Sequence, residues 1–113
     1  MDKDGPALHL FDENGKTRVG LCADKEGALL NLADDNAKVR VALGARKGGP
    51  ALFLLDENGK DRVTLDASKD GAALSLVDEN GKTRAQLNAV KSGPHLFLFD
   101  QNGTQIWGSP ALR

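Results

Sequence analysis

Leucine and valine alternate with polar or small residues in short runs along the whole chain. The first run places Leu8 and Leu10 two residues apart, and the second places Val19, Leu21 and Ala23 at the same interval. A period of two is the signal of a strand with one apolar face. No stretch keeps the three- and four-residue apolar spacing of an amphipathic helix for long enough to form one. The pattern predicts two strands, at about residues 7–12 and 17–23.

This pair of runs recurs every 22 residues. The segment Asp12-Glu13-Asn14-Gly15 returns, with small changes, at positions 34, 56, 78 and 100. We therefore expect a single all-β domain, residues 1–113, made of five 22-residue repeats and ten short strands. The units span approximately residues 4–25, 26–47, 48–69, 70–91 and 92–113, and the last is a cap. Equivalent apolar positions include Leu8, Leu30, Leu52, Leu74 and Leu96, and also Val19, Val41, Val63, Ala85 and Trp107.

The short connection in each unit predicts a hairpin. Asn-Gly between alternating runs favours a two-residue type I′ turn, because both of its central residues need a positive φ. A turn at Asn14-Gly15 places Leu10 opposite Val19 and Leu8 opposite Leu21, so the apolar side chains share one face. Ala37 replaces the glycine in the second unit, so that turn should be strained or of another type.

The longer connection, residues 23–28 in the first unit, allows two registers. If Leu21 lies opposite Leu30, the sheet has no net stagger. If Ala23 lies opposite Leu30, each unit adds two residues of stagger, and ten strands can close into a barrel with a shear of ten. Both registers give an antiparallel hairpin meander, either a barrel or a curved sheet.

A two-sheet parallel β-solenoid is the alternative, with each 22-residue unit forming one coil. The first strand of each unit would then lie in one sheet and the second strand in the other. Apart from the leucine positions, the first strands carry partly apolar side chains on their other face, and the second strands carry polar or small ones. Either fold leaves apolar side chains outside, and we expect them to be covered by another subunit or a protein partner. The candidate interface residues are Phe11, Phe53, Leu55, Phe97 and Phe99.

The fifth unit departs from the pattern after Gly103. Ile106 stands in the place of the arginine, Trp107 in that of the valine and Ser109 in that of the leucine, and Pro110 follows. Terminal repeats are usually atypical because they must end the array. We expect Trp107 to plug the end of the core or the closing seam.

Composition narrows the classes of function. The 113 residues include 15 Lys and Arg and 16 Asp and Glu, so the net charge is −1 and the basic excess of a nucleic-acid-binding protein is missing. The single cysteine, Cys22, cannot form an internal disulfide. No apolar run reaches the ~18–20 residues that span a bilayer.

The motifs predict no catalytic, cofactor-binding or metal site. The Asp-x-Asn-Gly segments resemble the start of a calcium loop, but the ligands stop after two and Lys16 follows directly, so turn formation explains them. His9 and His95 occupy different positions of the repeat, and Cys22 has no histidine nearby. In the predicted hairpin Arg18 lies opposite Phe11, which its stem can cover. The same residues recur five times, whereas an enzyme gathers unlike residues at one place.

The segment Leu-x-Leu-Phe-Asp-Glu-Asn-Gly-Lys-Thr-Arg-Val-x-Leu, residues 8–21, resembles repeats of uncharacterised bacterial proteins. It is more distantly similar to the YD repeats of bacterial Rhs-type proteins, and that resemblance implies hairpins in a shell-like sheet. The tyrosine position of those repeats holds Phe11, Ala33, Leu55, Val77 and Phe99 here. We expect a non-enzymatic structural or interaction module that self-associates. The alternative is a repeated-site ligand- or glycan-binding module. The chain has one Trp and no Tyr, which counts against aromatic platforms for sugars.

Overall fold

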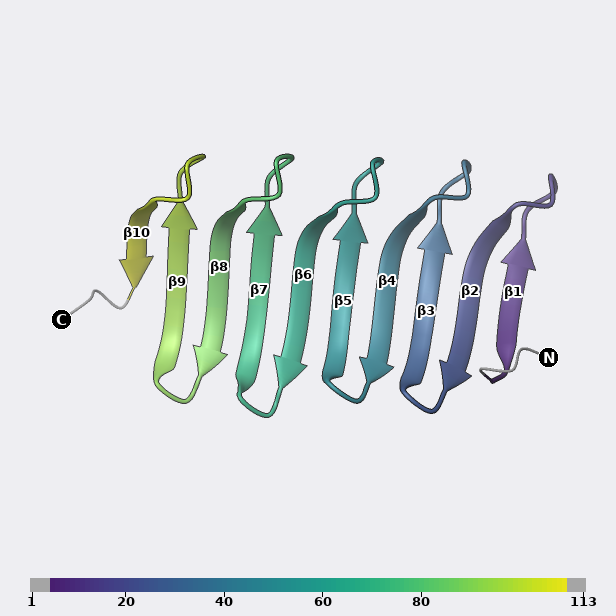
Figure 1. The fold of residues 1–113 in the computed structure, drawn as a ribbon, viewed down its shortest axis with the longest axis horizontal. Helices are drawn as coiled ribbons and strands as arrows, with labels where there is room; N and C mark the ends of the chain where they lie inside the picture. Colours follow the sequence, from purple (N-terminus) through teal and green to yellow (C-terminus); the bar gives the residue numbers. More distant parts are fainter. Residues whose placement is uncertain (1–4, 110–113) are drawn as a thin grey trace.

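The protein is a single antiparallel β-sheet. The structure, a computed structural model, describes residues 5–109; Pro110 and Ala111 of the expected cap lie outside them. The sheet contains ten strands that pair in chain order, each with the one before and the one after it (Figure 1). The strands are β1 (Ala7–Phe11), β2 (Thr17–Asp24), β3 (Gly27–Ala33), β4 (Val39–Arg46), β5 (Gly49–Leu55), β6 (Asp61–Ser68), β7 (Gly71–Val77), β8 (Thr83–Val90), β9 (Gly93–Phe99) and β10 (Gln105–Ser109). The hairpin meander is confirmed and the parallel solenoid is wrong.

The Asn-Gly turns are three-residue loops rather than type I′ turns. The Gly15 amide donates to the Asp12 carbonyl oxygen at 3.0 Å, and the Asp12 amide donates to the Lys16 carbonyl oxygen at 2.9 Å. Gly15 has a φ of 81°. This is a type I turn followed by a left-handed residue that forms a bulge. Our prediction of a type I′ turn is wrong, although it paired Leu10 with Val19 correctly.

The Asp12 side chain explains the type of turn. Its Oδ1 accepts hydrogen bonds from the backbone amides of Asn14 at 2.8 Å and Lys16 at 3.0 Å. These bonds hold the turn residues in the right-handed region and leave only Gly15 with positive φ. Ala37 adopts the same conformation, with a φ of 65° and the same 3.0 Å bond to Asp34. The strain predicted for Ala37 is therefore present, in a turn of the same type.

The turns at the other end of the strands set the stagger of the sheet. Asp24 pairs with Gly27 across a two-residue turn, and Leu21 pairs with Leu30. This is the register without net stagger, so the sheet stays open and the barrel alternative is wrong.

The glycine that follows each of these turns has a positive φ. Gly71 has a φ of 140°, and a Cβ at this residue would overlap the carbonyl oxygen of Ala89 on the next strand. Glycine therefore permits the close approach of neighbouring hairpins at this end of the sheet.

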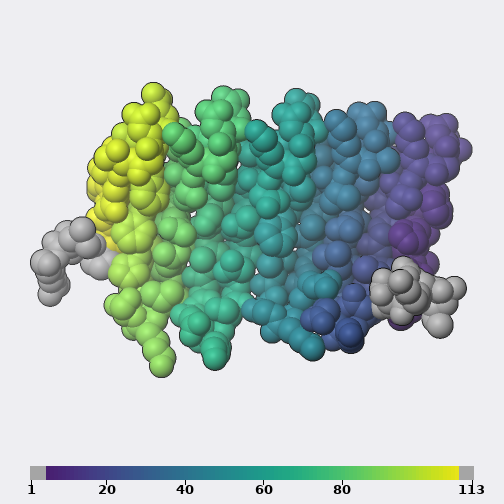
Figure 2. Space-filling model, in the orientation of Figure 1, coloured from purple at the N-terminus to yellow at the C-terminus, as the bar shows by residue number. Residues whose placement is uncertain are grey.

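No second layer packs on the sheet in the part of the chain that the structure describes. Among residues 5–109 no hydrophobic side chain is fully buried. The radius of gyration is 17.2 Å, against about 13 Å for a compact chain of this length. The accessible surface is 8078 Å², about 2,000 Å² more than a compact 12.0 kDa monomer exposes. In Figure 2 the hairpins stand side by side in chain order as one continuous slab. The residues that the sequence indicates as core therefore lie on an uncovered face.

Candidate interaction surface: the leucine face

Three rows of apolar side chains run across one face of the sheet, which we call the leucine face. Residues paired across neighbouring strands lie on the same side, and so do residues two apart in one strand. The leucine row contains Leu8, Leu21, Leu30, Leu43, Leu52, Leu65, Leu74, Leu87 and Leu96 and ends at Ser109.

Two further rows flank the leucine row. The Leu/Val row, on the side of the Asn-Gly turns, contains Leu10, Val19, Leu32, Val41, Leu54, Val63, Leu76, Ala85, Leu98 and Trp107. The alanine row, on the other side, contains Ala23, Ala28, Ala45, Pro50, Ala67, Ala72, Ala89 and Pro94. None of the side chains in these three rows, all within residues 5–109, is charged.

The leucine face is exposed to solvent over its whole length. Leu8 is 58% exposed at one edge, Leu43 and Leu65 are each 45% exposed near the centre, and Trp107 is 49% exposed at the other edge. Soluble monomers rarely leave a contiguous apolar patch larger than a few hundred Å². Three rows on strands of about seven residues, ~4.8 Å apart, cover on the order of 1,000 Å². A face of this size points to an interaction surface.

The residues predicted as an interface lie on the opposite face, which we call the mixed face. Phe53 pairs with Ala42 and Thr64, and Phe97 pairs with Gln86 and Gly108. The predicted residues stand on three strands: Phe11 on β1, Phe53 and Leu55 on β5, and Phe97 and Phe99 on β9. The strands between them carry polar side chains, including Thr64, Ser75 and Gln86. The structure therefore places these aromatic residues in separate stripes, and their role at an interface stays a prediction.

Trp107 lies on the edge strand β10, opposite Leu98. Because the sheet is open, it has no closing seam for this side chain to fill, and that part of the prediction is wrong. Ile106 replaces the arginine that each earlier unit uses to reach the next hairpin, so β10 ends that series of contacts. Its position at the end of the array agrees with a capping role, which stays a prediction.

Charged side chains join successive hairpins at the Asn-Gly end of the sheet. Arg18 Nε donates to the Ala33 carbonyl oxygen on β3 at 3.0 Å, and its guanidinium lies 3.6 Å from Asp12 Oδ2. Lys16 Nζ donates to the Asp35 carbonyl oxygen in the next turn at 3.1 Å. The arginine contacts recur at Arg40, Arg62 and Arg84, and the lysine contacts at Lys38 and Lys60.

Our expectation that Arg18 lies opposite Phe11 is wrong. The bulge at the turn pairs Phe11 with Thr17 instead, and Arg18 points toward the following hairpin. Arg18 therefore connects one hairpin to the next. Its guanidinium and the Asp12 carboxylate form an exposed ion pair, and such a pair adds little stability by itself.

The aspartates of these turns have lowered pKa values. The pKa of Asp12 lies below its usual value chiefly because its carboxylate accepts a hydrogen bond from the Lys16 amide. Partial desolvation opposes this effect, and the Asn14 amide and Arg18 add to it. Asp34, Asp56 and Asp78 show the same direction with the equivalent amide as the largest cause. Each carboxylate therefore already has turn and arginine partners, as expected for a structural residue.

The remaining candidate chemistry stays dispersed. Cys22 is exposed on the mixed face, opposite Ala7 and Leu29. The Nε2 atom of His95 lies 3.1 Å from the Ser92 hydroxyl oxygen, and the His95 ring stacks on Phe97. His95 stands on β9 and His9 on β1, so the two histidines are eight strands apart. Within residues 5–109, no cluster of three or more His, Cys, Asp or Glu side chains is placed to hold a metal ion. In the same part of the chain, no helix is long and apolar enough to cross a membrane.

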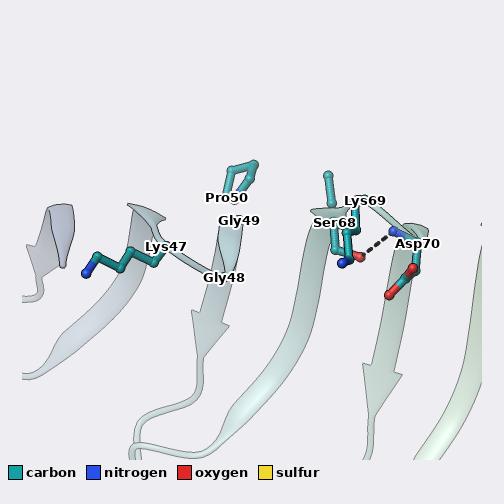
Figure 3. Close-up of a pocket in the computed structure, with 8 residues that line it drawn as sticks. Lys47, Gly48, Gly49, Pro50, Ser68, Lys69 and Asp70 are labelled. Carbon is teal, nitrogen blue, oxygen red and sulfur yellow. Dashed lines mark hydrogen bonds between the residues drawn. The ribbon is translucent and has the colours of Figure 1, made fainter.

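One open hollow of about 700 Å³ lies between two neighbouring turns. It is lined by Lys47–Pro50 on one side and by Ala67, Ser68, Lys69 and Asp70 on the other (Figure 3). The Asp70 amide donates to the Ser68 hydroxyl oxygen at 3.2 Å, which stabilises the turn. This hollow is a gap between adjacent hairpins, and its side chains do not converge on a common point.

No protein-family model matches the chain, and no curated protein is similar to it. The candidate surface therefore depends on its own geometry.

The sequence predicted the apolar positions of the leucine face but left open whether they belong to a barrel, a curved sheet or a solenoid. The signal that reveals the open face is the register of the second turn, because a sheet without stagger cannot close into a barrel. Within residues 5–109 every strand belongs to this one sheet, so none of the described strands covers the leucine face.

Proposed function

We propose that this protein is a non-enzymatic structural module that self-associates through its sheet. The observation that carries the proposal is the uncovered leucine face, on which large apolar side chains such as Leu43 and Leu65 are each 45% exposed. Burying such a face against another protein removes apolar surface from water, which is the main favourable term in association. The repeated hairpins and the arginine and lysine hydrogen bonds that connect them support a role as a scaffold.

Sedimentation-velocity ultracentrifugation over a concentration series tests the proposal. We expect a discrete oligomer at micromolar concentration, and a strict monomer at about 100 µM overturns self-association. Trp107 provides a second readout, because the only tryptophan of the chain lies on the leucine face. Its emission should shift to longer wavelength when dilution dissociates the oligomer.

Two matched variants on β6 identify the face used. Leu65→Lys places a charge on the leucine face, and Thr64→Lys places the same charge on the mixed face at the neighbouring residue. We expect Leu65→Lys to weaken association by at least ~100-fold, because a lone charge is costly to bury. Thr64→Lys should leave association within a few-fold of the original protein. The reverse result assigns the interface to the mixed face and contradicts a role for the leucine face.

A further inference from the structure

We infer that the leucine face packs on the leucine face of a second copy, with the strands of the two sheets reversed end for end. In this arrangement the two-fold axis runs along the long direction of the sheet, beneath the leucine row. The alanine row of each copy then lies against the Leu/Val row of its partner. This inference rests on the proposed self-association and adds the face-to-face pairing of two leucine faces and their relative orientation.

The area favours a second copy. The leucine face covers on the order of 1,000 Å², so two such faces bury about 2,000 Å² in total, which is at the upper end of a standard stable interface. The rows contain no charged group, within residues 5–109, that would select a different protein. The strands of two copies repeat at the same spacing of ~4.8 Å, so the apolar rows of one copy match those of the other.

The flatness of the sheet is a second, independent indication. An ordinary twist of ~20–25° between neighbouring strands would rotate the tenth strand by about half a turn relative to the first. In Figure 1 the strand axes instead keep nearly the same direction from one edge of the sheet to the other. Flat sheets of many strands are typically stabilised by stacking or by side-chain ladders. The hydrogen bonds from the arginine and lysine side chains to backbone carbonyls of the next hairpin supply such a ladder at one end of the strands, and a second sheet supplies the stacking.

The sizes of the side chains decide the orientation. One side of the leucine face ends in the bulky Leu/Val row and the other side in the alanine row. If like rows faced each other, two bulky rows would meet at one end and two small rows at the other, so the sheets would splay apart. Reversing one sheet places bulky against small along both sides, which lets the layers interdigitate at a constant spacing.

Hollows on the alanine row fit this arrangement. One, of about 350 Å³, is lined by Leu43, Leu52 and Leu65 and by the small residues Ala67 and Ala72. Another, of about 390 Å³, lies on the same row near β1 and is lined by Ala23 and Ala28 among others. The reversed arrangement brings leucine and valine side chains of the partner over these hollows.

Distance measurement between spin labels tests the orientation. We choose Glu57, which is exposed at the tip of the β5–β6 turn in the middle of the sheet, and label Glu57→Cys in a Cys22→Ser background. In the reversed arrangement the two labels lie at opposite ends of the strands, so their separation should be close to the 29 Å width of the sheet. A dimer with like rows together would bring them to about the ~10 Å spacing of packed sheets.

A mixed sample provides the matched control. When one copy carries Glu57→Cys and the other Lys69→Cys, at the opposite end of the strands, the reversed arrangement predicts a short separation of about 10–15 Å. A short distance between two Glu57 labels overturns the inference but leaves self-association standing. So does a distance of about 48 Å or more, as in edge-to-edge joining, where ten strand spacings of ~4.8 Å separate the labels. A protein that stays monomeric overturns both, so the two failures are distinguishable.

Discussion

Replacing Ala37 with glycine should stabilise the protein. Ala37 is the one residue other than glycine with positive φ within residues 5–109, at 65°. A side chain in the left-handed region costs about 1–2 kcal/mol. Glycine regains this energy but loses more conformational entropy on folding, by about 0.4–1 kcal/mol. We therefore expect Ala37→Gly to raise the free energy of unfolding by about 0.5–1 kcal/mol, which corresponds to ~2–6 °C in Tm.

Thermal and urea denaturation, followed by circular dichroism, measure this change. All samples must have the same protein concentration, because association makes the apparent stability depend on concentration. Gly59→Ala is the matched control, since Gly59 occupies the equivalent turn position with a φ of 82° and has no atom within 4 Å of an added Cβ. It should lower the free energy of unfolding by a similar amount. If the two substitutions do not have opposite signs, the backbone argument is refuted.

Two further predictions concern the two ends of the strands. Because the pKa of Asp56 is lowered in the folded state by the Lys60 amide, its contribution to stability is complete above the unfolded value of 3.8 and is lost as the pH falls through the lower folded pKa. Urea denaturation from about pH 2 to pH 6 should therefore show a rise in stability with pH, and Asp56→Asn should reduce that rise without abolishing it; an unchanged profile contradicts the assignment. At the other end, Gly71→Ala should destabilise the protein by more than Gly59→Ala, by at least about 2 kcal/mol, because its Cβ meets the Ala89 carbonyl in addition to the strained φ. Equal losses in the two alanine variants, measured by the same denaturation, would show that this close approach is relieved at no cost.

The strands and their apolar pairs could be predicted from the sequence because a period of two leaves little freedom. Residues 7–12 and 17–23 were expected as strands, and the structure has Ala7–Phe11 and Thr17–Asp24. The pairs Leu10–Val19 and Leu8–Leu21 follow from placing all apolar side chains on one face. A slip by one residue would have turned them to the other face.

The turn type was missed because a side chain competes with the Asn-Gly signal. Asn-Gly alone favours a type I′ turn, but the Asp12 carboxylate bonds the amides of Asn14 and Lys16 and selects a longer loop with a bulge. The bulge in turn moves Arg18 away from Phe11 and toward the next hairpin. One short side chain therefore decides both the loop and the contact between hairpins.

The open face could not be predicted from the local pattern because it depends on the second turn. Both registers considered for residues 23–28 keep apolar side chains on one side, and they differ only in stagger. The pairing of Asp24 with Gly27 across two residues, which the glycine permits through its φ of 138°, excludes the staggered register.

The absence of stagger has a consequence for how such a chain can change in length. Each internal hairpin meets its neighbours through the same pairs, as Leu21–Leu30 and Leu43–Leu52 illustrate. Removing one 22-residue unit from the interior, or inserting one there, would rejoin equivalent positions and leave every row of the leucine face continuous. The sheet would change in length by two strand spacings, about 10 Å, while its width along the strands and its two edge strands stayed the same. A gene encoding this fold can therefore lengthen or shorten its product by duplication or deletion of whole units, without redesign of any contact.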